Sequence, residues 1–213
     1  MIIEEYKNIR NAGKDLANKV LDFKKGNREE TIYAGKLLGF WDGKAMIFDS
    51  DDESDVLMDF LIYERNKRGV KLIDKFYDSE TELNDIEEEI LEGMVSYHSS
   101  LFEIININRE SCILTLIDLF DKNHKEFKLI DLGLSQSCRI GLVFYYRLLP
   151  IRDINMTSGV SFGFDSSVKD RILSDISFAR FKRKGKLNST DLFVLTHKKS
   201  KQYGINIVSQ EMT

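Results

Sequence analysis

Residues 101–164 decide the fold, and they read LFEIININRESCILTLIDLFDKNHKEFKLIDLGLSQSCRIGLVFYYRLLPIRDINMTSGVSFGF. This stretch contains five runs rich in β-branched and aromatic residues, which favour strands. Short polar clusters, such as 108–111 and 121–124, separate the runs and are typical of turns. The spacings predict strands without intervening helices, at residues 101–107, 112–119, 126–129, 140–149 and 154–164.

The pattern inside each run indicates its place in a sheet. The second run is apolar at both alternating sets of positions, which predicts a central strand covered on both faces. The fourth run meets Pro150, the only proline, which predicts an edge or a corner. The last run alternates most cleanly, with Ile154, Met156, Val160, Phe162 and Phe164 on one side.

Five short antiparallel strands commonly avoid exposed edges by closing into a small barrel. We therefore expect an α+β protein in which N-terminal helices pack on a five-stranded antiparallel β-barrel, SH3-like or OB-like, followed by C-terminal helices. An open meander covered by helices is the alternative. The predicted organisation is a mainly helical acidic region at 1–100, the barrel or meander at 101–165, and a basic extension at 166–213, all in one compact unit.

Composition limits the class of protein. With 213 residues, 42% apolar and 31% charged, the chain can bury a core without disulfides or metals. It lacks a signal-peptide pattern and any run of about 20 apolar residues, which predicts a cytoplasmic protein without a membrane span. Its two cysteines, Cys112 and Cys138, predict reduced core thiols rather than zinc ligands. We expect no cofactor.

The charge is unevenly distributed. Residues 1–100 carry 14 Lys and Arg against 23 Asp and Glu, whereas residues 169–213 carry 10 against 4. Five of these cations fall within seven residues, where they could contact phosphates while Phe178 and Phe181 stack on bases. Cations also suit a helix C-terminus, and that interpretation is preferred. The candidate nucleic-acid ligands are Arg180, Phe181, Lys182, Arg183, Lys184 and Lys186.

The acidic run at residues 49–53 also has two interpretations, as a metal site or as the start of a helix. Its acidic side chains could bind a divalent cation, as in a metal-dependent hydrolase. However, Ser50 followed by Glu53 predicts a helix capping box, and acidic residues are favoured in a first helical turn. We prefer the capping interpretation. The alternative metal ligands are Asp49, Asp51, Asp52 and Glu53.

Other chemistry has little support in the sequence. The glycine-rich, nucleophile-elbow and paired-histidine motifs of common enzymes are absent from the chain. A helix is predicted to run through His98 into the first strand, and an isolated histidine of this kind is usually a surface or capping residue. Asp118 and Asp131 end adjacent predicted strands and could form a carboxylate pair, although such aspartates more often bind turn amides.

Four short segments, taken in order, resemble an uncharacterised bacterial family, some of whose members carry zinc-binding SEC-C tails. The resemblance covers about residues 35–165 and implies a bacterial protein of undefined activity, with no catalytic residues carried over. This chain has no C-terminal cysteines, so the resemblance implies no zinc here. The segments are Asp59-Phe60-Leu61-Ile62-Tyr63, Leu101-Phe102-Glu103-Ile104, Ile117-Asp118-Leu119 and Arg147-Leu148-Leu149-Pro150.

Together, these patterns predict a non-catalytic binding or adaptor module that acts on a protein partner, because small barrels bind through surface grooves. Self-association through the opposite charges of the two ends is a further expectation. The alternatives are weak binding of RNA or DNA by the 180–186 segment, and a divalent-metal-dependent hydrolase that uses the 49–53 run.

Overall fold

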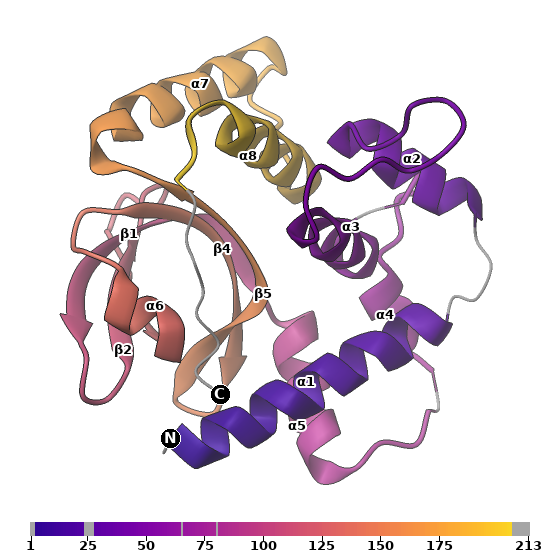
Figure 1. The fold of residues 1–213 in the computed structure, drawn as a ribbon, viewed down its shortest axis with the longest axis horizontal. Coiled ribbons are helices and arrows are strands. Elements are labelled where there is room, and N and C mark those ends of the chain that lie inside the picture. The colour runs from indigo at the N-terminus through magenta and orange to yellow at the C-terminus, as the bar shows by residue number, and fades with distance from the viewer. Residues whose placement is uncertain (1–2, 24–27, 65, 80, 206–213) are drawn as a thin grey trace. The chain divides into compact units, whose positions relative to one another are not determined.

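A computed structural model describes residues 3–23, 28–64, 66–79 and 81–205 (Figure 1). The chain forms two compact units. The helical unit is Met1–Ser96, and the barrel unit is Tyr97–Thr213. The basic 166–213 segment therefore belongs to the same unit as the strands.

The helical unit contains α1 (Ile3–Phe23), α2 (Arg28–Leu38), α3 (Asp52–Tyr63), α4 (Leu72–Tyr77) and α5 (Asp85–Val95). Apolar residues spaced three, four and seven apart give α1 one buried face, made of Tyr6, Ile9, Leu16 and Val20. This face packs against α3, α4 and α5. A capping box starts α5, in which the Asn84 side chain and the Glu87 side chain each accept a backbone N–H of the other residue.

The barrel unit contains β1 (His98–Asn108), β2 (Ile113–Asp118), β3 (Glu126–Ile130), β4 (Val143–Ile151) and β5 (Ile154–Phe164). The strands pair in the closed order β1-β2-β3-β5-β4, because β1 pairs with both β2 and β4. The predicted α+β class and the five-stranded sheet are confirmed.

The expectation of a wholly antiparallel sheet was wrong. β3 and β5 run parallel, with Leu129 opposite Asn155, while the other four pairings are antiparallel. Alternation shows which face a residue takes but not the direction of the neighbouring strand. A parallel pairing needs a crossover of a dozen or more residues, and residues 131–153 supply it through a short helix and β4.

That helix, α6 (Leu132–Ser137), corrects the expectation of strands without intervening helices. Asp131 caps it by accepting the amide of Leu134 at 2.8 Å. The fourth strand also differs from the expected 140–149, since it begins at Val143 and continues through Pro150 to Ile151. Pro150 lies opposite Asn155 beside the β4–β5 hairpin turn, where its missing N–H is tolerated.

Side-chain parity decides what fills the barrel. The even-numbered residues within 102–104 of β1, 114–116 of β2 and 144–148 of β4 point inward. They pack with one residue of β3 and three from the α6 region. The outer face of β4 and β5 is covered by α8 (Ser189–Tyr203), whose buried Phe193 contacts Tyr145 and Phe162. A 3₁₀ turn (Ser166–Val168) and α7 (Lys169–Lys182) connect β5 to α8. The interior residues are Phe102, Ile104, Leu114, Leu116, Leu129, Leu134, Cys138, Leu142, Phe144, Tyr146 and Leu148.

Candidate functional site

A polar cluster occupies the end of the barrel where β1 begins and β2 ends. His98 and Ser100 precede Phe102 on the inward parity of β1, and Asp118 follows Leu116 on the inward parity of β2. The pairing of Phe102 with Asp118 brings the two strand ends together. The inward-facing side chains of β1 and β2 are therefore apolar in the barrel interior and polar at this end.

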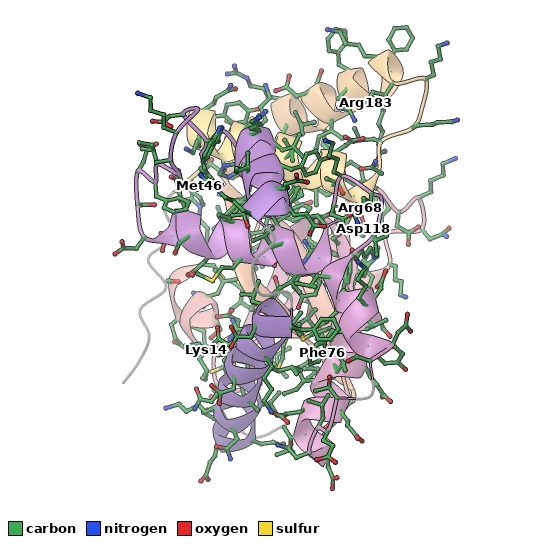
Figure 2. The ribbon with its side chains drawn as sticks, turned by 90° about the vertical axis from the view of Figure 1, so that its right-hand side faces the viewer. Lys14, Met46, Arg68, Phe76, Asp118 and Arg183 are labelled. Carbon is green, nitrogen blue, oxygen red and sulfur yellow. The ribbon has the colours of Figure 1, made fainter. Side chains whose placement is uncertain are left out.

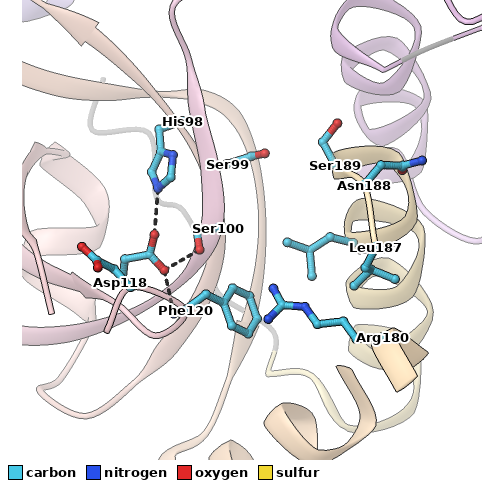
Figure 3. Close-up of a pocket in the computed structure, with 11 residues that line it drawn as sticks. His98, Ser99, Ser100, Asp118, Phe120, Arg180, Leu187, Asn188 and Ser189 are labelled. Carbon is cyan, nitrogen blue, oxygen red and sulfur yellow. Dashed lines mark hydrogen bonds and ion pairs between the residues drawn. The ribbon is translucent and has the colours of Figure 1, made fainter. Parts of the chain in front are cut away.

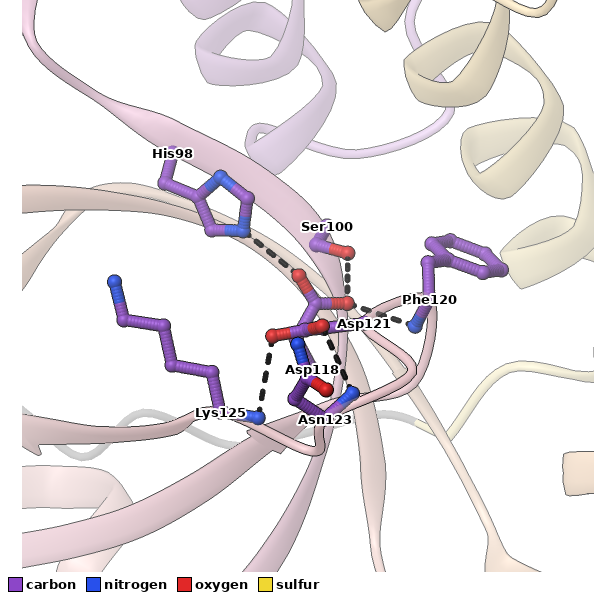
Figure 4. Close-up of polar contacts among 7 residues, drawn as sticks. All are labelled: His98, Ser100, Asp118, Phe120, Asp121, Asn123 and Lys125. Atoms are coloured by element: carbon purple, nitrogen blue, oxygen red, sulfur yellow. Dashed lines mark hydrogen bonds and ion pairs between the residues drawn. The ribbon is translucent and has the colours of Figure 1, made fainter.

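Asp118 is the centre of the cluster, with only 7% of its side chain exposed (Figure 4). One carboxylate oxygen accepts the Ser100 hydroxyl at 2.6 Å and the Phe120 amide at 2.8 Å. The other lies 2.8 Å from Nε2 of His98, whose side chain is 49% exposed. The imidazole also stacks on Phe127, with ring centroids 5.3 Å apart.

These contacts favour the ionised form of Asp118. Burial acts to raise the pKa of Asp118, but the hydrogen bonds from His98, Ser100 and the Phe120 amide together outweigh burial, so the pKa is lowered. An ionised carboxylate only accepts hydrogen bonds, so Nε2 of His98 is the donor in its contact with Asp118. Ser100 bonds the carboxylate rather than the imidazole, so this is not a Ser-His-Asp triad.

The lowered pKa predicts acid sensitivity of the barrel unit. The ionised Asp118 carboxylate stabilises the fold fully at pH values above the ordinary aspartate pKa. This stabilisation is lost as the pH falls through the lower pKa of the folded state, so the loss lies below about pH 4. We expect the wild-type protein to lose more stability between pH 5 and pH 3 than Asp118→Asn does. Amide hydrogen exchange of β1 and β2 across this range measures the difference. Identical acid profiles for the two proteins would contradict the prediction.

A pocket of about 390 Å³ opens beside the cluster (Figure 3). Residues at the start of β1, including Ser99, and in the turn after β2, including Phe120, form one side. The other side comes from α7, α8 and the turn between them. Arg180 reaches from α7 toward the Phe120 ring, and its guanidinium carbon lies 4.2 Å from the ring centroid. The full lining is His98, Ser99, Ser100, Asp118, Phe120, Asp121, Arg180, Leu187, Asn188, Ser189 and Leu192.

The segment 178–186, called the α7 tip below, continues from this pocket. The helix ends in a Schellman motif, in which the Gly185 amide bonds the Arg180 carbonyl and the Lys184 amide bonds the Phe181 carbonyl. Lys184 takes the left-handed position with φ 54°. Phe178 is 57% exposed and Phe181 is 81% exposed, and three residues of spacing place them on neighbouring parts of the helix surface. Side chains around the labelled Arg183 project outward in Figure 2.

The structure separates the five predicted cations into different environments. Arg180 lines the pocket, and Lys182 lies over the Phe178 ring at 4.6 Å. Arg183 forms an ion pair with Asp191 in the first turn of α8. Lys184 and Lys186 are exposed, and among the described residues they form no ion pair. The α7 tip therefore has separable structural and solvent-facing cations.

The acidic run lies in the helical unit and is arranged as a helix start. Glu53 accepts the Asp49 amide at 2.7 Å, while Asp51 and Asp52 are exposed. The predicted Ser50–Glu53 capping box was wrong, since α3 begins at Asp52 and the Glu53 carboxylate reaches back four residues instead of three. Within the described ranges, no group of three or more His, Cys, Asp or Glu side chains is placed to hold a metal ion.

Sequence reasoning missed the roles of His98, Ser100 and Phe120. A helix was expected to run through His98, but α5 ends at Val95 and β1 begins at His98. The inward parity of β1 was the available signal, and it could be used only with the correct strand start. The suggested Asp118–Asp131 pair was wrong, because these residues lie at opposite ends of β2.

Comparison with known proteins gives one match. A family model covers residues 1–210, and its description is a family of unknown function (DUF7986). No curated protein and no solved structure matches the chain. In the part of the chain that the structure describes, no helix combines the length and the apolar character needed to cross a membrane.

Proposed function

Because the chain belongs to this family of unknown function, which assigns it no activity, we propose a function from the site itself: the barrel unit binds single-stranded nucleic acid through the α7 tip. The bacterial origin implied by the family resemblance and the cytoplasmic location expected from the sequence are part of this proposal.

The observation that carries the proposal is the exposure of Phe181 next to solvent-facing cations. Its side chain is 81% exposed, Phe178 lies one helical turn away, and Lys184 and Lys186 follow directly. Bases stack on aromatic side chains regardless of sequence, while lysines neutralise the backbone phosphates. An aromatic pair flanked by cations supplies both interactions.

The charge of the barrel unit supports the same ligand. Residues 97–213 carry 17 Lys and Arg against 12 Asp and Glu, a net charge of +5. The acidic residues that make the whole chain negative lie in residues 1–96, which carry 14 against 23. A net positive unit attracts a polyanion and raises its rate of association.

The barrel type is also consistent with this ligand. Of the two types expected from the sequence, the OB type is a five-stranded Greek-key barrel that binds oligonucleotides, and we assign the barrel to it. The strand count and the order in which β5 lies between β3 and β4 support this assignment. The surface proposed here lies at the α7 tip rather than on the β2–β3 face that OB barrels commonly use.

The backbone at Lys184 provides a further argument. A non-glycine residue in the left-handed region costs about 1–2 kcal/mol, and glycine is the usual residue at this position of a Schellman motif. Strained positions of this kind are found at functional sites. A lysine here loses stability but places a cation beside Phe181.

We therefore predict that Lys184→Gly weakens binding without weakening the fold. Fluorescence anisotropy with a labelled single-stranded RNA, in low and high salt, measures the affinity. The salt slope should fall by about 0.7 for each lost phosphate contact. Phe181→Ala should reduce affinity by about 1–3 kcal/mol, the value of one stacked base. The melting temperature of Lys184→Gly should be unchanged or higher.

The matched control is Lys198→Gln, which removes an exposed cation of α8 outside the α7 tip. It should leave affinity unchanged. Arg183 is unsuitable as a test position, because its ion pair with Asp191 joins α7 to α8. Absence of binding at low salt, or equal affinity of all variants, would contradict the proposal and favour the protein partner expected from the sequence.

A further inference from the structure

The pocket beside the α7 tip has the size of a small-ligand site. Its volume of about 390 Å³ falls in the range of pockets that hold small molecules. Arg180 lines this pocket, and Phe181 is the next residue along α7. A nucleic-acid strand that stacks one base on Phe181 can therefore bring a neighbouring phosphate to the pocket.

Arg180 is the charged group that the pocket offers to a ligand. Its guanidinium lies on the Phe120 ring at 4.2 Å, and within the described part of the chain it forms no ion pair. This cation–π contact restrains the guanidinium and its fork of N–H donors beside the pocket. Such a planar fork of donors matches the oxygens of a phosphate, and its pre-orientation reduces the entropy lost on binding.

The carboxylates of the pocket are already engaged by donors. Asp118 accepts three hydrogen bonds, as described above. Asp121 accepts the amides of Asn123 at 3.0 Å and Lys125 at 3.3 Å. Figure 4 shows the Asp121 carboxylate directed toward this loop. On the opposite side of β1, the Ser99 hydroxyl points toward α8 across the pocket and can donate to an oxygen ligand (Figure 3).

We infer that the pocket holds one phosphate group of the bound strand, with the Arg180 guanidinium as its main ligand and the Ser99 hydroxyl as a second donor. This inference rests on the proposed nucleic-acid binding and adds the chemical group recognised at the pocket.

Isothermal titration of the full chain with adenosine monophosphate and with adenosine tests the inference. The monophosphate should bind and adenosine should not, because only the former carries the group that Arg180 recognises. Arg180→Gln should weaken monophosphate binding by about tenfold to hundredfold, the usual effect of losing hydrogen bonds to a charged group. The affinity of Arg180→Lys for the monophosphate should lie between those of the wild type and Arg180→Gln, because lysine keeps the charge but lacks the planar fork of donors.

Arg171→Gln is the matched control, because Arg171 also lies on α7 and stacks on an aromatic ring, that of Tyr203, at 4.7 Å. It should bind the monophosphate like the wild type. Phe181→Ala should keep monophosphate binding while losing affinity for RNA. RNA binding that Arg180→Gln leaves intact, together with no monophosphate binding, would overturn the pocket inference and leave the α7 tip proposal standing. If the wild-type protein binds neither RNA nor adenosine monophosphate, the α7 tip proposal and the pocket inference are both overturned.

Discussion

Replacing Asp118 by alanine is expected to lower the unfolding free energy of the barrel unit by about 3 kcal/mol. The substitution removes a buried acceptor and leaves the Ser100 hydroxyl and the Phe120 amide without their partner. It also removes the group that fixes the His98 ring. Three contacts are lost together, and the apolar barrel interior gives no substitute acceptor.

Hydrogen exchange of β1 and β2 amides is the appropriate measurement for Asp118→Ala. The single tryptophan, Trp41, lies in the helical unit, so its fluorescence reports on the other part of the chain. Asp121→Ala is the matched control. Among the described residues, the Asp121 carboxylate accepts hydrogen bonds only from amides of its own turn, so the substitution should cost less than about 1 kcal/mol. Equal losses in the two variants would show that Asp118 is not the centre of the cluster.

Phe144→Ala should have the largest effect on stability, about 3–5 kcal/mol. Phe144 is fully buried in the barrel interior and stacks on Tyr146 with ring centroids 4.9 Å apart. Its removal leaves a cavity enclosed by a closed sheet, which cannot collapse easily. Chemical denaturation followed by circular dichroism, with hydrogen exchange to assign the change to the barrel unit, measures the loss.

Tyr146→Phe on the same strand is the informative control, because the expected sign is opposite. Among the described residues, the Tyr146 hydroxyl has no hydrogen-bond partner, and burial raises the pKa of this phenol well above its ordinary value. Removing an unsatisfied buried hydroxyl should leave stability unchanged or raise it by about 1 kcal/mol. A loss as large as that of Phe144→Ala would mean that the hydroxyl is satisfied in solution.

The sequence predicted the strands better than their arrangement. Alternation within residues 154–164 matches the inward and outward positions of β5, because side-chain parity is a local property. The parallel contact of Leu129 with Asn155 is not local, and no feature of either strand encodes it. Helix α6 was missed because a six-residue helix is too short to show helical periodicity.

The candidate site was only partly predictable for the same reason. The cations of the α7 tip are adjacent in the sequence, so their clustering was visible. The pairing of His98 with Asp118 joins residues from two strands, and the partner of Arg183 lies eight residues further on, in α8. The Phe120 ring that holds Arg180 is 60 residues away from it, which no pattern reveals.

Closure of the sheet has a consequence for how the chain folds. Glu103 of β1 pairs with Ile117 of β2, which is the next strand in the sequence. It also pairs with Val143 of β4, which lies 40 residues away. Long-range pairing slows folding, and until it forms, the strands present open edges that can associate with other chains. The pocket spans from His98 to Leu192. Ligand binding there would consequently report complete folding, since a chain stopped after β5 lacks one entire wall.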